Sequence, residues 1–278
     1  MLLEARRRGS PRQIISTRLL ATAAFAAVIV VSVAGCKTTG PETTGSIGAQ
    51  AAPTGEVDWR RLRDYWGQRY HANPSDAQAA IDYARALRAM EQRAQAVAVL
   101  QEASIRNPHN KELLGDYGRA LADAGQYAQA LSALSRAHTP DNPDWRILNA
   151  QGAVLDQMGR HTEAQRHYSA ALKIAPNAPS VLSNLGLSYA LEKNLKQAEV
   201  VLRRAVGQPG ANPKVRQNLA LIVGLQGRFA EAEQIAAADL PPQEAAANVA
   251  YLRQMLAQRG NWKQMSQQPY VLSPDKRS

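Results

Sequence analysis

The chain has 278 residues, a formal net charge of +10 and a single cysteine. That length is enough for one or two domains, and one cysteine excludes an intramolecular disulfide. The first 36 residues hold five arginines against one glutamate (Arg6, Arg7, Arg8, Arg12, Arg18 and Glu4). Beyond residue 76 there is no compact run of Lys and Arg interleaved with aromatic residues, which argues against nucleic-acid binding.

An export signal is the first predicted element. Residues 1–18 are basic, and residues 19–35 (LLATAAFAAVIVVSVAG) are apolar and uncharged, as in the n-region and h-region of a secretory signal. A single transmembrane anchor is the alternative, although the run of 17 residues is at the short limit for crossing a bilayer.

The end of the apolar run favours a lipoprotein signal. Val33-Ala34-Gly35-Cys36 places an apolar residue and two small residues before the cysteine, and it resembles a bacterial lipobox. The resemblance implies that residues 1–35 are a signal peptide and that Cys36 is lipidated, which would anchor the chain stably in a membrane. Lys37 in place of aspartate implies sorting to the outer membrane, with the protein facing the periplasm of a Gram-negative bacterium.

Two further elements precede the main body of the chain. Residues 36–55 are mostly Thr, Gly, Pro, Ser and Ala, which predicts a flexible tether after the lipidated cysteine. Residues 56–76 are predicted to be an N-terminal capping helix with aromatic and apolar residues at helical spacing (Trp59, Leu62, Tyr65, Trp66 and Tyr70). An aromatic binding helix is the alternative, but this segment is in phase with the second helix of the repeat described next, and repeat arrays need caps.

Residues 77–246 repeat with a period of 34 residues. Alanines and glycines recur at this spacing (Ala96, Ala130, Ala164, Ala198 and Ala232; Gly118, Gly152 and Gly186; Gly125, Gly159 and Gly227). A helix-turn-helix unit of 34 residues resembles the tetratricopeptide repeat, which implies an all-α superhelical solenoid. We expect five contiguous frames, 77–110, 111–144, 145–178, 179–212 and 213–246. A small residue at Gly152 is expected to let the paired helices approach closely.

The C-terminal region is predicted to close the array. Residues 247–266 are expected to form a C-terminal capping helix, the first helix of an incomplete sixth unit, with a turn at Gly260-Asn261-Trp262. Residues 267–278 are polar and contain proline, which predicts a flexible tail.

The sequence offers no catalytic constellation. The histidines are dispersed (His71, His109, His138, His161 and His167), and the chain has no thiols beyond Cys36 to complete a zinc site. Phosphate-binding, nucleophile-elbow and dinucleotide-binding motifs are also missing from the sequence. We therefore expect a protein that is not an enzyme, with no cofactor, no metal, no nucleic acid and no small-molecule substrate.

The tetratricopeptide resemblance implies that the first helix of each pair lines a protein-binding groove. Residues at matching offsets in the frames differ along the groove. They are charged in the first two repeats (Arg85, Arg88, Arg119 and Asp123) and polar in the third (Asn149, Asp156 and Gln157). In the last two repeats they are mostly leucines (Ser183, Leu187, Leu191, Gln217, Leu221 and Leu225). The leucines are expected either to bind a partner or to be covered by the C-terminal helix. Tetratricopeptide domains of the chaperone-cochaperone type bind a terminal carboxylate with Lys and Asn side chains. This chain has other residues at those offsets (Ile81, Arg85, Gly115 and Arg119), which argues against binding of a terminal carboxylate.

The two ends of the chain resemble TadD-type lipoproteins of the tight-adherence (Flp) pilus system. The resemblance rests on Cys36-Lys37-Thr38-Thr39, the short tether, about five repeats and the ending NVAYLRQML at residues 248–256. It implies a partner in pilus assembly, the outer-membrane secretin or a protein bound to it. Two alternatives stay open: a pilotin or outer-membrane protein assembly subunit of another system, and a regulatory partner of an envelope enzyme such as a peptidoglycan synthase.

Overall fold

The computed structural model describes residues 56–267, with the side chains of residues 56–258. Within this range the chain forms twelve α-helices and no strand, and one isolated bridge pairs Thr139 with Asn142. The expected signal peptide, the lipidated Cys36 and the tether lie outside the described residues, as do residues 268–278 of the expected tail.

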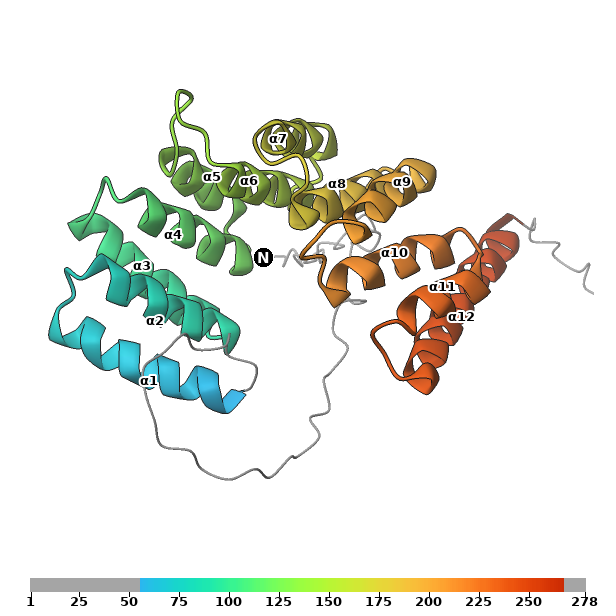
Figure 1. Cartoon of the computed structure of the whole chain (residues 1–278), viewed down its shortest axis with the longest axis horizontal. Helices are drawn as coiled ribbons and strands as arrows, with labels where there is room; N and C mark the ends of the chain where they lie inside the picture. The colour runs from blue at the N-terminus through green and yellow to red at the C-terminus, as the bar shows by residue number, and fades with distance from the viewer. Residues whose placement is uncertain (1–55, 268–278) are drawn as a thin grey trace, which may run out of the picture. The chain divides into compact units, whose positions relative to one another are not determined.

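Five helical hairpins make up the centre of the described chain (Figure 1). Their first helices are α2 (Ala77–Ala89), α4 (Lys111–Asp123), α6 (Trp145–Gln157), α8 (Pro179–Leu191) and α10 (Pro213–Leu225). Their second helices are α3 (Arg93–Arg106), α5 (Tyr127–Arg136), α7 (His161–Ile174), α9 (Leu195–Val206) and α11 (Phe229–Ala236). Each first helix begins at the first residue of a predicted frame. The fold is therefore the all-helical tetratricopeptide solenoid that the sequence predicted.

Helix contacts give the array its direction of curvature. Each first helix contacts the first helix of the next hairpin, α2 with α4, α4 with α6, α6 with α8 and α8 with α10. Among the described residues, the backbones of the second helices of neighbouring hairpins do not approach one another in this way. The first helices therefore lie on the inner side of the curve, and Figure 1 shows the hairpins side by side in chain order.

Capping residues explain where the first helices begin. The residue before α2, α4, α6 and α10 has a side-chain oxygen that accepts a hydrogen bond from a backbone N–H in the first helical turn (Asp76, Asn110, Asp144 and Asn212). Such caps satisfy N–H groups that have no partner inside the helix. Before α8 the equivalent residue is Ala178, which does not cap, and Pro179 opens the helix instead.

The turn inside each hairpin uses one residue with positive φ. Gly125, Gly159 and Gly227 have φ of 76°, 74° and 84°, which confirms that they mark one recurring turn. The other two copies use Glu91 and Lys193 at the same offset, with φ of 59° and 66°. Because side chains disfavour this region, these two turns are held by the hairpins around them.

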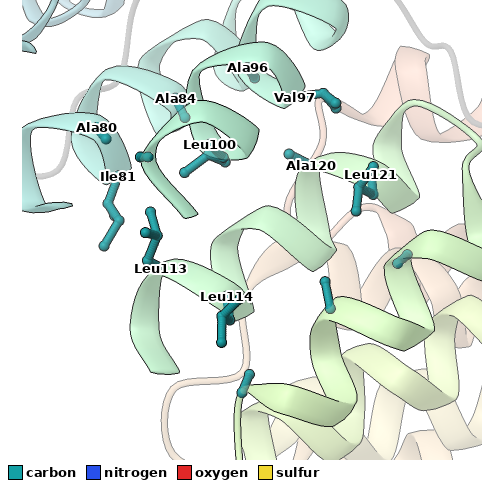
Figure 2. Packing of buried hydrophobic residues seen from close by; sticks show 14 of the residues in the cluster. Ala80, Ile81, Ala84, Ala96, Val97, Leu100, Leu113, Leu114, Ala120 and Leu121 are labelled. Atoms are coloured by element: carbon teal, nitrogen blue, oxygen red, sulfur yellow. The ribbon is translucent and has the colours of Figure 1, made fainter. Parts of the chain in front are cut away.

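Small residues set the closest approach of paired helices. A Cβ added at Gly152 would lie 2.5 Å from Tyr168 Cε1, and one at Gly118 would lie 2.5 Å from Leu134 Cγ. The expectation for Gly152 is therefore confirmed. Figure 2 shows buried hydrophobic residues nearer the N-terminus, where Ile81, Leu100 and Leu113 come from three successive helices.

Helix α1 (Glu56–Ala72) packs on α2 in the place that a second helix takes. Its Tyr70 is buried and donates a hydrogen bond from Oη to Glu102 at 2.8 Å. Gly67 lies against the ring of Tyr83, while Tyr65 is exposed. The inward aromatic side chains thus cover the start of the array, and Tyr65 faces solvent.

At the other end, α12 (Pro242–Gln267) packs on α11 and α10 through Ala245 and Val249. It differs from the prediction in two respects. It begins five residues earlier than residue 247, and it continues through residue 260, where a turn was expected. A single glycine costs a helix only about 1 kcal/mol, so Gly260 does not end it.

Candidate protein-binding surface

The inner face of the first helices is the candidate binding surface, and we call the residues predicted to line it the groove residues. They lie on α2, α4, α6, α8 and α10, the helices that contact one another along the inner side. The structure brings the arginines together on α2 and α4 and the leucines together on α8 and α10, with Asn149 between them on α6.

The arginines at the early end are paired with carboxylates. Arg85 donates to Asp116 at 2.9 Å, to Glu112 at 3.0 Å and to Asp82 at 3.2 Å. Burial of Arg85 works against its charged form, but its hydrogen bonds to Asp116 and Glu112 raise its pKa overall. The guanidinium of Arg85 is thus already hydrogen-bonded to carboxylates of its own and the next first helix.

Asp116 is the centre of this early cluster. It is 4% exposed and faces three arginines, because Arg88 and Arg119 lie 3.9 and 3.8 Å from its carboxylate oxygens. Arg88 also donates to Asp123 at 2.6 Å. The early end therefore presents a neutralised network of charges rather than a free anion-binding site.

The middle of the face carries neutral hydrogen bonds between repeats. Asn184 donates to Asn149 Oδ1 at 3.0 Å, and Asn218 donates to Ser183 Oγ at 2.9 Å. Each of these bonds joins a first helix to the next one. Asn149 is therefore partly occupied in holding α6 to α8.

Asp156 differs from its predicted role as a groove residue. Its side chain is 8% exposed and accepts hydrogen bonds from Tyr168 at 2.9 Å and Ser188 at 2.8 Å. Its Oδ1 also lies 2.9 Å from His161 Nδ1. Burial, and then the nearby carboxylate, raise the pKa of Tyr168. The groove prediction for Asp156 was wrong because the partners on α7 and α8 turn the carboxylate inward.

The late end carries the leucines. Leu187 and Leu221 are half-buried and 34 residues apart, and Leu191 is 40% exposed. None of these three belongs to a hydrophobic cluster in the described chain. Leu225, in contrast, packs against a cluster that contains Val249 of α12. The C-terminal helix comes close to the neighbouring Gly224, where an added Cβ would lie 2.6 Å from Leu252 Cδ2. The other three leucines remain outside the hydrophobic clusters.

Sequence reasoning missed the pairing of the charges. Arg85 was predicted as a groove residue without a partner, and Asp116 lies 31 residues further along the chain. Comparing opposite charges at offsets of 31 and 35 residues would have revealed the Arg85–Asp116 and Arg88–Asp123 pairs.

The described part of the chain has neither a metal-ligand cluster nor a membrane-spanning helix. Residues 56–267 contain no group of three or more His, Cys, Asp or Glu side chains that could hold a metal ion. In the same range, no helix combines the length and the apolar character needed to span a bilayer.

Comparison with known proteins supports the repeat. Two sequence models, each described as a tetratricopeptide repeat, match residues 87–152 and 149–215. No curated protein sequence matches the chain. The repeat identity is thus shown for the central hairpins.

Among solved structures, PilW, described as a widely conserved type IV pilus biogenesis factor, is similar with a TM-score of 0.60. The sequences are 17% identical, and the match covers 70% of this chain and 91% of PilW. At this identity the likeness shows the fold alone.

Two larger proteins share the fold with a TM-score of 0.55 and 16% identity. The match covers 69% of this chain and 40% of the chain from the Cut9–Hcn1 hetero-tetramer of APC/C. It covers 66% of this chain and 46% of human IFIT1, whose structure is a dimer with m7Gppp-AAAA. The chain thus spans less than half the length of either protein.

Proposed function

We propose that this chain is a lipid-anchored, non-catalytic scaffold in the outer membrane of a Gram-negative bacterium, facing the periplasm. Its role is to assist the assembly or localisation of the secretin of a tight-adherence (Flp) pilus. The lipobox-like segment ending at Cys36 supports the anchor, and the two ends of the sequence support the pilus system. PilW, a type IV pilus biogenesis factor with the same fold, is consistent with a role in pilus biogenesis.

The observation that carries the binding role is the late end of the inner face. Leu187, Leu191 and Leu221 lie on α8 and α10 outside the hydrophobic clusters of the described chain. Leu191 is exposed and Leu187 and Leu221 are half-buried, and apolar surface that the fold leaves uncovered is typical of interaction sites. An apolar strand or amphipathic helix of the secretin, or of a protein bound to it, is the partner that suits this surface.

The test is the double variant Leu187→Asp with Leu221→Asp. Burying one leucine in an interface is worth about 1.5–3 kcal/mol, so we expect the double change to abolish a micromolar interaction. Secretin assembly and surface piliation are the readouts. The thermal melt followed by circular dichroism should stay close to that of the unmodified chain, since neither side chain is part of the core.

A matched control places the same charges on the second helices. Ile105 and Val200 are 75% and 62% exposed on α3 and α9, so Ile105→Asp with Val200→Asp adds two aspartates away from the inner face. This control should assemble secretin and pili normally. A normal melt of the leucine variant together with undiminished piliation would refute the proposed partner site, and a collapsed melt would show that the leucines are core.

The membrane arm of the proposal rests on Cys36. Cys36→Ser removes the thiol that would receive the lipid, so we expect loss of palmitate labelling and accumulation of the unprocessed chain. Labelling and cleavage are read from metabolic incorporation and from the size of the protein. Normal labelling and cleavage of the serine variant would exclude a lipoprotein.

A further inference from the structure

The connection between α5 and α6 leaves a cavity on the second-helix side of the array. Residues 137–144 make this connection, whereas residues 107–110 suffice between α3 and α4 and residues 175–178 between α7 and α8. The cavity has a volume of about 510 Å³, and its lining includes His138, Pro140, Leu148, Lys173 and Ile174. Leu148 is 8% exposed here, while its equivalents Leu114 and Leu182 are each 1% exposed.

Three polar residues stand at this junction where the following repeats have apolar ones. His138 corresponds to Leu172 and Val206, Gln151 to Leu185 and Leu219, and His167 to Val201 and Ile235. All six of these apolar residues are in hydrophobic clusters or pack against them. The repeat itself therefore does not require polar groups at these three positions.

These polar groups also lack partners. His138 Nδ1, Gln151 Oε1 and His167 Nδ1 are three of the four buried side-chain polar atoms in the described chain that have no hydrogen-bond partner. Gln151 as a whole is only 6% exposed. Buried polar atoms without partners destabilise a fold, and each needs an explanation such as a ligand.

Only one of the three residues lines the cavity, and the other two lie behind its lining. His138 lines it directly, while Gln151 and His167 each stand one helical turn from a lining residue, Leu148 and Ala170. Burial lowers the pKa of His167, and the nearby His138 lowers it further. The imidazoles are therefore close neighbours.

We propose that this cavity is a second interaction site, which takes an apolar peptide segment carrying a carboxylate. The apolar lining suits aliphatic side chains, and Ile174 at the rim is 44% exposed. Of the lining residues, His138 offers an imidazole N–H donor to a carboxylate, and Lys173 adds a positive charge. The site is on the second-helix side and so is separate from the leucines of the inner face.

The test replaces the three polar residues by those of the next repeat, His138→Leu with Gln151→Leu and His167→Val. Binding to the full chain is measured with the labelled peptide acetyl-SLVELS-amide and its glutamine analogue acetyl-SLVQLS-amide. We expect the glutamate peptide to bind the unmodified chain at least about tenfold more tightly than the analogue. The triple variant should bind it at least about tenfold more weakly and melt at a higher temperature, because it no longer buries unpaired polar atoms.

Four outcomes would overturn the inference. Equal binding of the two peptides excludes a carboxylate site, and unchanged binding to the triple variant places the peptide elsewhere. A lower melting temperature of the triple variant shows that the polar groups are already satisfied within the fold. Octanoate displacing the peptide at an equal concentration shows that any carboxylate suffices. The variant Leu187→Asp with Leu221→Asp should keep peptide binding, so that a failure of this site and a failure of the pilus proposal remain distinguishable.

Discussion

The groove residue at one recurring offset is arginine in the first two repeats and leucine in the last two (Arg85 and Arg119; Leu187 and Leu221). Both pairs lie on first helices that contact one another in the same way. Around the arginines the structure places acidic partners, with Asp116 almost fully buried, whereas the two leucines have no place in a hydrophobic cluster. The two halves thus share the same helix contacts. They differ in their inner-face side chains, which have partners in the early half and none in the late half.

The late half carries a network of charges on its second helices. Glu199 on α9 accepts hydrogen bonds from Arg203 at 2.8 Å and from Arg228 at 2.7 Å, and Glu231 on α11 pairs with the same two arginines. On the first helices α8 and α10, by contrast, Leu187 and Leu221 have no charged partner and lie outside the hydrophobic clusters. The repeat therefore determines which helices contact one another, but it does not determine whether the first or the second helices carry the ion pairs.

The largest expected effect comes from removing the carboxylate at the centre of the early cluster. Asp116→Ala leaves three arginines without their shared partner, and we expect a loss of about 2–3 kcal/mol in the free energy of unfolding. The loss is below that of a fully buried pair because the side chain of Arg85 is 42% exposed. Asn184→Ala, at the same offset in the fourth repeat, should cost about 1 kcal/mol. Equal losses in urea denaturation would remove the distinction between the halves.

The second prediction concerns the scaffold that the halves share. Ala164 is 0% exposed where α7 meets its hairpin partner, so Ala164→Leu should overpack the contact and cost about 1–3 kcal/mol. Ala128 on α5 is exposed and lies outside the recurring small-residue positions, and Ala128→Leu should change stability by no more than about 0.5 kcal/mol. Similar effects of the two variants in chemical denaturation would contradict the assigned repeat frame.

The periodic features were predictable from the sequence because every hairpin repeats them. Gly152 and Gly159 recur at 34-residue spacing, and their roles in close approach and in the turn follow from backbone geometry alone. The start of each first helix was also predictable, since the frames begin at the residues where the helices begin.

The features that were not predictable belong to single repeats. Asp156 turns inward only because Tyr168 and Ser188 lie opposite it, and no other repeat offers that combination. The early shortening of α5 that opens the cavity beside His138 leaves the 34-residue phase intact, so the period could not reveal it. Similarly, α12 continues past Gly260, since a single glycine costs a helix only about 1 kcal/mol.

The smallest expected effect tests the charges of the late half by acid. Burial works against ionisation of Glu199, but hydrogen bonds from Arg228, Gln226 and Arg203 lower its pKa from the usual 4.5 to about 2. As pH falls between these values, the unfolded chain takes up a proton that the folded chain does not, so stability declines in that window. The decline is small because the side chains of Arg203 and Arg228 are 45% and 43% exposed.

Glu199→Gln should flatten this part of the profile of unfolding free energy against pH, whereas Glu233→Gln, on the exposed side of α11, should leave it unchanged. If the Glu199 variant keeps the full decline between roughly pH 4.5 and pH 2, the acid sensitivity comes from elsewhere and the late network contributes nothing measurable.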